Sequence, residues 1–192
     1  MSGISPPTGQ LRPMTADDLD MVRTWRNHPE IARHMLNSER IHADDHAAWF
    51  ARSLELPHRH LLIYSIDTPC GFVQFNAIDP KGKIAEWGFY LAPEAPRGTG
   101  QSLGRCALNY AFDKIDLHKV FGQVLGSNKR SLRFHERLGF AVEGILREQH
   151  IRQGDFEDLH CYGLLQREWR ERSAVKDLSL IHISEPTRPL YI

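Results

Sequence analysis

The chain has 192 residues, and its 24 Lys plus Arg balance 24 Asp plus Glu, so the formal net charge is zero. A neutral chain lacks the basic field that holds nucleic acid nonspecifically, and this length favours one domain with a sizeable core. No apolar run approaches the ~18 residues of a membrane span, so we expect no membrane association. Three cysteines without Cys-x-x-Cys spacing and an amino terminus unlike a signal peptide favour the cytoplasm.

The amino-terminal half is predicted to begin with a strand, Gln10–Met14. Thr15 then starts a helix whose apolar face carries Leu19, Val22 and Trp25. The next predicted elements are a short helix from Pro29, a helix over Ala43–Leu54, and strands over Leu61–Ile66, Gly71–Ile78 and Ile84–Leu91.

The carboxyl-terminal half is predicted to continue the alternation of helix and strand. The elements are a helix over Leu103–Ile115, a strand over Lys119–Leu125, a helix capped by Asn128, and a hairpin of Val142–Ile151 and Leu159–Leu165 that turns at Gln153–Asp155. Residues 173–192 contain two prolines, continue no periodicity and resemble translated sequencing-adapter read-through. We therefore expect a domain over residues 10–172 and a disordered or artefactual tail over 173–192.

A glycine-rich turn between strand and helix, Pro96–Gly104, is the most informative stretch. Such a turn at a helix amino terminus is an anion site, because the unpaired amides and the helix dipole both favour phosphate. No Lys follows the glycines, as a P-loop requires. Gly98-Thr-Gly100-Gln-Ser-Leu-Gly104 has one residue too many for a dinucleotide fingerprint, so a different phosphate-bearing ligand is expected.

Two motifs resemble the GCN5-related N-acetyltransferase (GNAT) family. Arg97-x-x-Gly100-x-Ser102 is similar to its pyrophosphate loop, with Ser102 in place of the usual Gly or Ala. The second motif begins at Asn128 and ends at Gly139-Phe140. It is similar to the family's Asn-x-x-Ser/Ala-x-x-x-Tyr-x-x-x-Gly-Phe, with His135 at the position of the Tyr.

The resemblance implies an α/β fold in which helices flank a mixed, mostly antiparallel sheet with splayed central strands. It also implies acetyl-CoA as co-substrate and no metal. A bulge in the strand over Glu86–Leu91 would leave backbone groups free for the pantetheine arm. The implied cofactor-binding residues are Phe89, Tyr90, Leu91, Arg97, Gly98, Thr99, Gly100, Gln101, Ser102, Leu103, Gly104 and Asn128.

The resemblance also suggests catalytic residues. Glu86 is the candidate base that removes a proton from the acceptor amine, and His135 is the candidate acid for the CoA sulfur. The alternatives are an exposed or salt-bridged strand residue for Glu86, a packed helix histidine for His135, and a helix cap only for Asn128. His42 and His46 are spaced i, i+4 but lack the Glu of a His-Glu-x-x-His motif, which argues against zinc.

The acceptor is predicted from a further resemblance. Segments around Arg26-Asn-His-Pro29 and His46 resemble family members that acetylate the 4-amino group of a UDP-amino sugar in pseudaminic-acid biosynthesis. Arg26, His46 and Asn76 are the implied substrate residues, and Arg26 suits a diphosphate. Acetylation of a protein amino terminus or small amine stays open, as does a non-catalytic acyl-CoA sensor. A homodimer is a further expectation, with Trp169 as an exposed aromatic residue.

Overall fold

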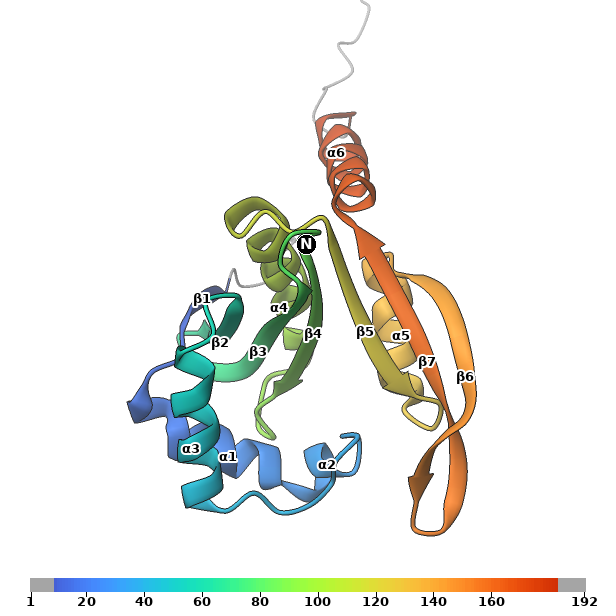
Figure 1. Ribbon diagram of the computed structural model, residues 1–192. Coiled ribbons are helices and arrows are strands. Elements are labelled where there is room, and N and C mark those ends of the chain that lie inside the picture. Colours follow the sequence, from blue (N-terminus) through green and yellow to red (C-terminus); the bar gives the residue numbers. More distant parts are fainter. Residues whose placement is uncertain (1–8, 183–192) are drawn as a thin grey trace, which may run out of the picture.

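A computed structural model describes residues 9–182 and shows one seven-stranded sheet flanked by helices (Figure 1). The strand order is β1-β2-β3-β4-β5-β7-β6, and every neighbouring pair is antiparallel except β4–β5, which is parallel. The strands are β1 Gln10–Pro13, β2 Arg59–Ile66, β3 Thr68–Asp79, β4 Ile84–Leu91, β5 Lys119–Leu125, β6 Ala141–Arg152 and β7 Asp155–Leu165. The predicted mixed α/β architecture is confirmed.

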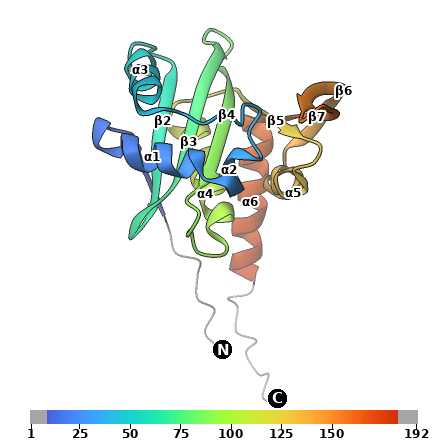
Figure 2. The ribbon, with the colours of Figure 1, turned by 90° about the horizontal axis from the view of Figure 1, so that it is seen from below.

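The helices in residues 9–138 lie close to where the apolar patterns predict them, whereas the last helix was not predicted. They are η1 Ala16–Asp18, α1 Leu19–Asn27, α2 Pro29–Ala32, α3 Ala43–Leu54, α4 Thr99–Asn109, the π-helical turn η2 Tyr110–Lys114, α5 Lys129–Leu138 and α6 Gln166–His182. Helices α1 to α3 gather on one side of β1–β4, whereas α4 packs on the other side (Figures 1 and 2). None of the helices in residues 9–182 is long and apolar enough to cross a membrane.

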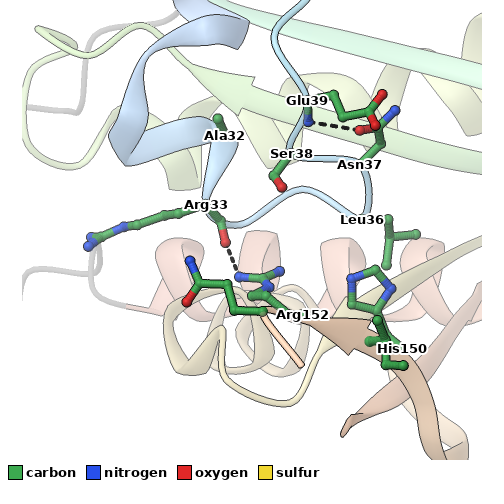
Figure 3. A pocket seen from close by; sticks show the side chains of 10 residues that line it. Ala32, Arg33, Leu36, Asn37, Ser38, Glu39, His150 and Arg152 are labelled. Carbon is green, nitrogen blue, oxygen red and sulfur yellow. Dashed lines mark hydrogen bonds between the residues drawn. The ribbon is translucent and has the colours of Figure 1, made fainter. Parts of the chain in front are cut away.

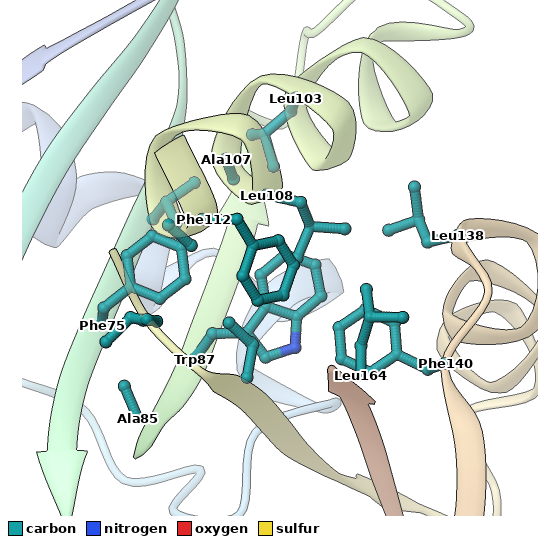
Figure 4. Packing of buried hydrophobic residues seen from close by; sticks show 14 of the residues in the cluster. Phe75, Ala85, Trp87, Leu103, Ala107, Leu108, Phe112, Leu138, Phe140 and Leu164 are labelled. Atoms are coloured by element: carbon teal, nitrogen blue, oxygen red, sulfur yellow. The ribbon is translucent and has the colours of Figure 1, made fainter. Parts of the chain in front are cut away.

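The main core lies between the sheet and helices α4 and α5. Trp87 of β4 is at its centre and stacks on Phe140 at 5.2 Å between ring centroids (Figure 4). Leu103 and Phe112 from the α4 side are fully buried against it. Because successive strand residues point to opposite faces, Trp87 faces this core while its neighbour Glu86 faces the α1–α3 side.

The sheet is splayed between β4 and β5. The two strands pair only from Ile84–Lys119 to Glu86–Phe121, although β4 continues to Leu91. Figure 1 shows them separating toward their lower ends. The backbone of β4 beyond Glu86 therefore has a strand partner on its β3 side alone within the described residues.

Two details of the sequence-based prediction are corrected. The pairing of β4 with β3 is continuous from Ala85 to Leu91, so the splay arises without the bulge expected there. Trp169, predicted as an exposed aromatic residue, is buried and donates a hydrogen bond from Nε1 to Asn109 Oδ1 at 2.9 Å.

Helix α6 crosses the predicted domain boundary at residue 172. Because it continues to His182, the expected disorder does not hold for residues 173–182, and Ser173 Oγ donates to Trp169 O at 3.0 Å. The rest of the predicted tail, 183–192, lies outside the described residues.

Candidate active site

The amino terminus of α4 has the geometry of an anion site. Gly98 precedes the helix at φ 89°, a left-handed conformation that glycine adopts without strain, and a Cβ built on it would meet no atom within 4 Å. Arg97, Gly98 and Gln101 are exposed, so the turn is accessible from solvent, and the Thr99 and Gln101 amides donate to Pro96 O and Gly98 O within it. These residues fit a pyrophosphate, which they would hold by backbone N–H groups and the Arg97 charge.

Two residues of the predicted loop have packing roles instead. Leu103 is fully buried in the core. A Cβ on Gly104 would lie 2.7 Å from Phe134 Cζ, so this glycine allows α4 and α5 to pack closely. Thr99 is also buried, and its Oγ1 donates to Pro96 O at 2.7 Å, which holds the turn.

Gly100→Asp is expected to weaken CoA binding at least tenfold, or about 1.4 kcal/mol. The added carboxylate would stand beside a phosphate group at the helix amino terminus. A Cβ at this position meets only Leu91 and Phe134, at 3.7 and 3.8 Å, so the fold tolerates it. Calorimetric titration with CoA measures the effect, with Gly100→Ala as the matched control. Equal affinity in the Asp and Ala variants would contradict the phosphate-loop assignment.

Glu86 lies at the point where β4 and β5 part. It is the last residue of β4 that pairs with β5, and Asn76 lies opposite it on β3. The side chain is half-buried, and burial raises its pKa. Within the described residues the carboxylate has no ion-pair partner, so the alternative of a salt-bridged strand residue is not supported. An unpaired carboxylate with a raised pKa suits a general base.

His135 does not have the geometry of a proton donor. It is only 3% exposed, its Nδ1–H donates to Ser131 O at 2.8 Å, and its Nε2 accepts from Trp87 Nε1–H at 3.2 Å. Trp87 Nε1 can only donate, so Nε2 carries no proton. Burial lowers the pKa of His135 to about 4, so the ring is neutral near pH 7. We therefore correct the predicted acid to a packed, hydrogen-bonded helix histidine.

Asn128 caps α5. Its Oδ1 accepts from Ser131 N at 3.0 Å, which is the cap predicted from the sequence. Phe89, Tyr90 and Leu91 occupy the part of β4 that has parted from β5. Cofactor contacts by their backbone groups and by Asn128 stay predictions.

The three predicted substrate residues do not form one group. Asn76 lies opposite Glu86. Arg26 Nη2 donates to Asn37 O, its Nη1 is buried without a partner in the described residues, and the guanidinium is close enough to Tyr90 to interact electrostatically. His46 is only 5% exposed and stacks on Trp49 at 5.0 Å. Direct substrate contact by His46 is therefore not supported.

No sequence pattern predicts the pocket that lies between the α2–α3 loop and the β6–β7 hairpin. This hairpin pocket has a volume of about 530 Å³, and Arg33, Glu39 and Arg152 line it (Figure 3). Arg152 spans it, because its guanidinium donates to Arg33 O and, at 3.4 Å, to Met35 O. A smaller outer pocket of about 380 Å³ lies beside it and shares Ala32 and Ser38.

Among the described residues no three His, Cys, Asp or Glu side chains gather as a metal-ligand set. The candidate site consists of three parts, of which the first is the candidate anion-binding amino terminus of α4. The other two parts are the open end of the splay between β4 and β5 and the carboxylate of Glu86, where the pairing of these strands ends.

Comparison with known proteins agrees with this geometry. The acetyltransferase PseH of Campylobacter jejuni is 22% identical over 130 residues, which cover 67% of this chain and 80% of that one. The spermidine N(1)-acetyltransferase of Vibrio cholerae is 31% identical over 104 residues, 54% of this chain and 60% of its own length. Its crystal structure with CoA and spermine has a TM-score of 0.80 at 22% identity, covering 85% of this chain and 98% of that one.

The first of the curated relatives match this chain over little more than half of their length. YdaF of Bacillus subtilis, a ribosomal-type N-acetyltransferase by name, is 33% identical over 102 residues, 52% of this chain and 55% of its own. The family described as acetyltransferase (GNAT) domain matches residues 10–141, which include the anion site, Glu86 and the α5 motif. The chain therefore belongs to the GNAT acetyltransferase family, whose co-substrate is acetyl-CoA.

Proposed function

We propose that this protein acetylates the 4-amino group of a UDP-amino sugar. The carrying observation is the charge of the hairpin pocket, between the α2–α3 loop and the β6–β7 hairpin, and of the outer pocket beside it. Their lining includes Arg33 and Arg152 in the first and Arg23 and Arg40 in the second, against one carboxylate, Glu39. Arginine forks match diphosphate oxygens, whereas a polyamine would be repelled.

Not all four arginines are equally available to an anion. Arg33 pairs with Glu30 at 2.6 Å and Arg152 with Glu157 at 3.3 Å, so neighbouring carboxylates offset part of their charge. Arg40 has no ion-pair partner within the described residues and lines a pocket that contains no acidic side chain. We assign it to the diphosphate.

Glu86 is the base in this proposal. An ammonium has no lone pair, so the carboxylate must accept a proton from the acceptor before the amine can attack. Asn76, opposite Glu86, is placed to orient the amino group, directly or through a water. Bound in the splay, acetyl-CoA supplies the acetyl thioester. The β4 backbone and the α4 turn would hold this co-substrate, which would place its thioester relative to Glu86 and let the CoA thiolate leave as the amine attacks.

A second candidate acceptor is a protein amino terminus or a small amine, which the names of YdaF and of the spermidine enzyme suggest. A non-catalytic acyl-CoA sensor is the third, and the unpaired Glu86 with its raised pKa favours catalysis over it. A UDP-amino-sugar enzyme binds UDP, whereas the other two do not.

Arg40→Ala is expected to lower kcat/KM for a UDP-4-amino sugar about tenfold, because one charged hydrogen bond to phosphate is worth about 1.5–3 kcal/mol and solvent screens part of it. Acetyl transfer is followed by release of free CoA thiol. UDP should inhibit the wild type competitively against the sugar. Arg52→Ala, an exposed arginine on α3 that lines neither pocket, is the control. A preference for spermidine or peptide, with no inhibition by UDP, would overturn the assignment.

We also propose a homodimer and a cytoplasmic location. The edge strand β6 exposes Val142, Ile145 and Leu146 at 42–53%, an apolar strip that a second copy can cover. All three cysteines are free thiols, which suits a reducing compartment.

A further inference from the structure

A polar pair lies inside the core at the start of α4. Tyr64 of β2 is fully buried, and its hydroxyl is 2.5 Å from Oγ of Ser102, the fourth residue of α4. Burial raises the pKa of Tyr64, so the phenol stays protonated and can donate. Ser102 occupies the position where similar pyrophosphate loops have Gly or Ala, neither of which can make this bond.

The packing around this pair leaves little space for movement. A Cβ built on Gly9 would lie 2.1 Å from the Tyr64 hydroxyl. A Cβ built on Gly71 would lie 2.5 Å from Leu103 Cδ1, in the same turn of α4. Both glycines lie where β1 and β3 approach the ring and the helix, so the first turn of α4 fits against the sheet in one orientation.

The orientation of α4 decides which side chains face the sheet, because successive side chains of a helix are about 100° apart around its axis. Ser102 points inward to Tyr64, whereas the exposed Arg97, Gly98 and Gln101 face outward. Holding α4 at Ser102 therefore fixes where its first turn and the preceding Arg97 lie relative to the sheet, whereas the amide N–H bonds themselves run along the helix axis. A polar link suits this task, because a hydrogen bond has a preferred direction and hydrophobic contact does not.

We propose that Tyr64 is a positioning residue for acetyl-CoA, because its hydrogen bond to Ser102 sets where the first turn of α4 lies against the sheet and so holds the pyrophosphate-binding turn in place. The bond couples strand β2, 38 residues earlier in the chain, to the cofactor turn. The inference concerns the co-substrate alone and holds whichever acceptor the enzyme uses.

The test is a double-mutant cycle on CoA affinity. Tyr64→Phe keeps the ring and removes the hydroxyl, and Ser102→Ala restores the usual residue of similar loops. Each change is expected to weaken CoA binding about fivefold in calorimetry, because a hydrogen bond of this kind contributes about 1 kcal/mol. The double variant should lose less affinity than the two single losses combined, since both changes remove the Tyr64–Ser102 bond. In Tyr64→Phe the loss should appear in the KM for acetyl-CoA more than in kcat at saturating acetyl-CoA.

Tyr110→Phe is the matched control. Its hydroxyl is also partly buried and contacts His60 Nδ1 at 3.4 Å, but it lies in η2 beyond the far end of α4. This variant should keep wild-type CoA affinity. A lower melting temperature with unchanged CoA affinity in Tyr64→Phe and Ser102→Ala would make the pair merely structural. Losses of affinity that add up in the double variant would also overturn the proposal.

Discussion

Glu86→Gln is expected to lower kcat by about 10²- to 10⁴-fold with CoA affinity unchanged, because the amide cannot accept the proton of the acceptor ammonium. In the wild type, burial raises the pKa of Glu86, so the carboxylate is protonated and inactive at low pH. Activity should therefore rise as the pH increases through this raised pKa. The residual activity of the Gln variant should lack this acidic limb, and a pH series of kcat measures the difference.

The control for Glu86 is Glu55→Gln, at the exposed carboxyl-terminal end of α3. It should keep both the rate and the pH profile of the wild type. The Gln variant at position 86 should fold normally, because the carboxylate forms no ion pair in the described part of the chain that the substitution would break. A wild-type pH profile in Glu86→Gln would discard Glu86 as the base.

The free energy of unfolding is expected to fall by about 3 kcal/mol between pH 6.5 and pH 4 through His135 alone. Its pKa is about 4 in the fold, against 6.5 for an unperturbed histidine. The folded state binds the proton more weakly, so the stabilisation is complete above pH 6.5 and is lost as the pH falls through about 4. Urea unfolding at a series of pH values measures the slope.

In His135→Phe the fall in the free energy of unfolding that His135 causes at low pH should disappear, because no group at that position takes up a proton. The variant should be less stable than the wild type near pH 7, since Trp87 Nε1 and Ser131 O both lose their partner. His118→Phe, a change at an exposed histidine, should keep the wild-type slope. An unchanged slope in His135→Phe would show that the imidazole is accessible to protons in the fold.

Periodicity and turn chemistry predicted most of the elements, because they are local properties. Helix α3 begins and ends as predicted, at Ala43 and Leu54, and so does strand β4, at Ile84 and Leu91. The glycine turn is predictable for the same reason, because the positive φ of Gly98 is a conformational requirement at a single residue. No part of helix α6, Gln166–His182, is predicted, because its sequence carries almost no apolar periodicity.

The site was harder to predict because burial and long-range contacts decide it. His135 matched the position of a family Tyr, yet its spacing with Leu132 and Leu138 already placed it on the buried face of α5. At His135 the family motif suggests an acid, whereas the apolar pattern of α5 predicts the burial that the structure has. The bond from Arg152 to Arg33 O joins residues 119 apart, and no local pattern reports such a contact.

The splay of the sheet has a consequence for the order of folding. Strands β2, β3 and β4 pair through short connections and are complete at residue 91, and β6 and β7 form a second local pair. Pairing between neighbours has a small loop-closure entropy and is fast. During synthesis the first set precedes α4, so the surface that receives Ser102 exists before the helix that carries it. The pairs of β4 with β5, of β1 with β2 and of β5 with β7 all join strands separated by a long connection, so they are expected to form later than these two local sets.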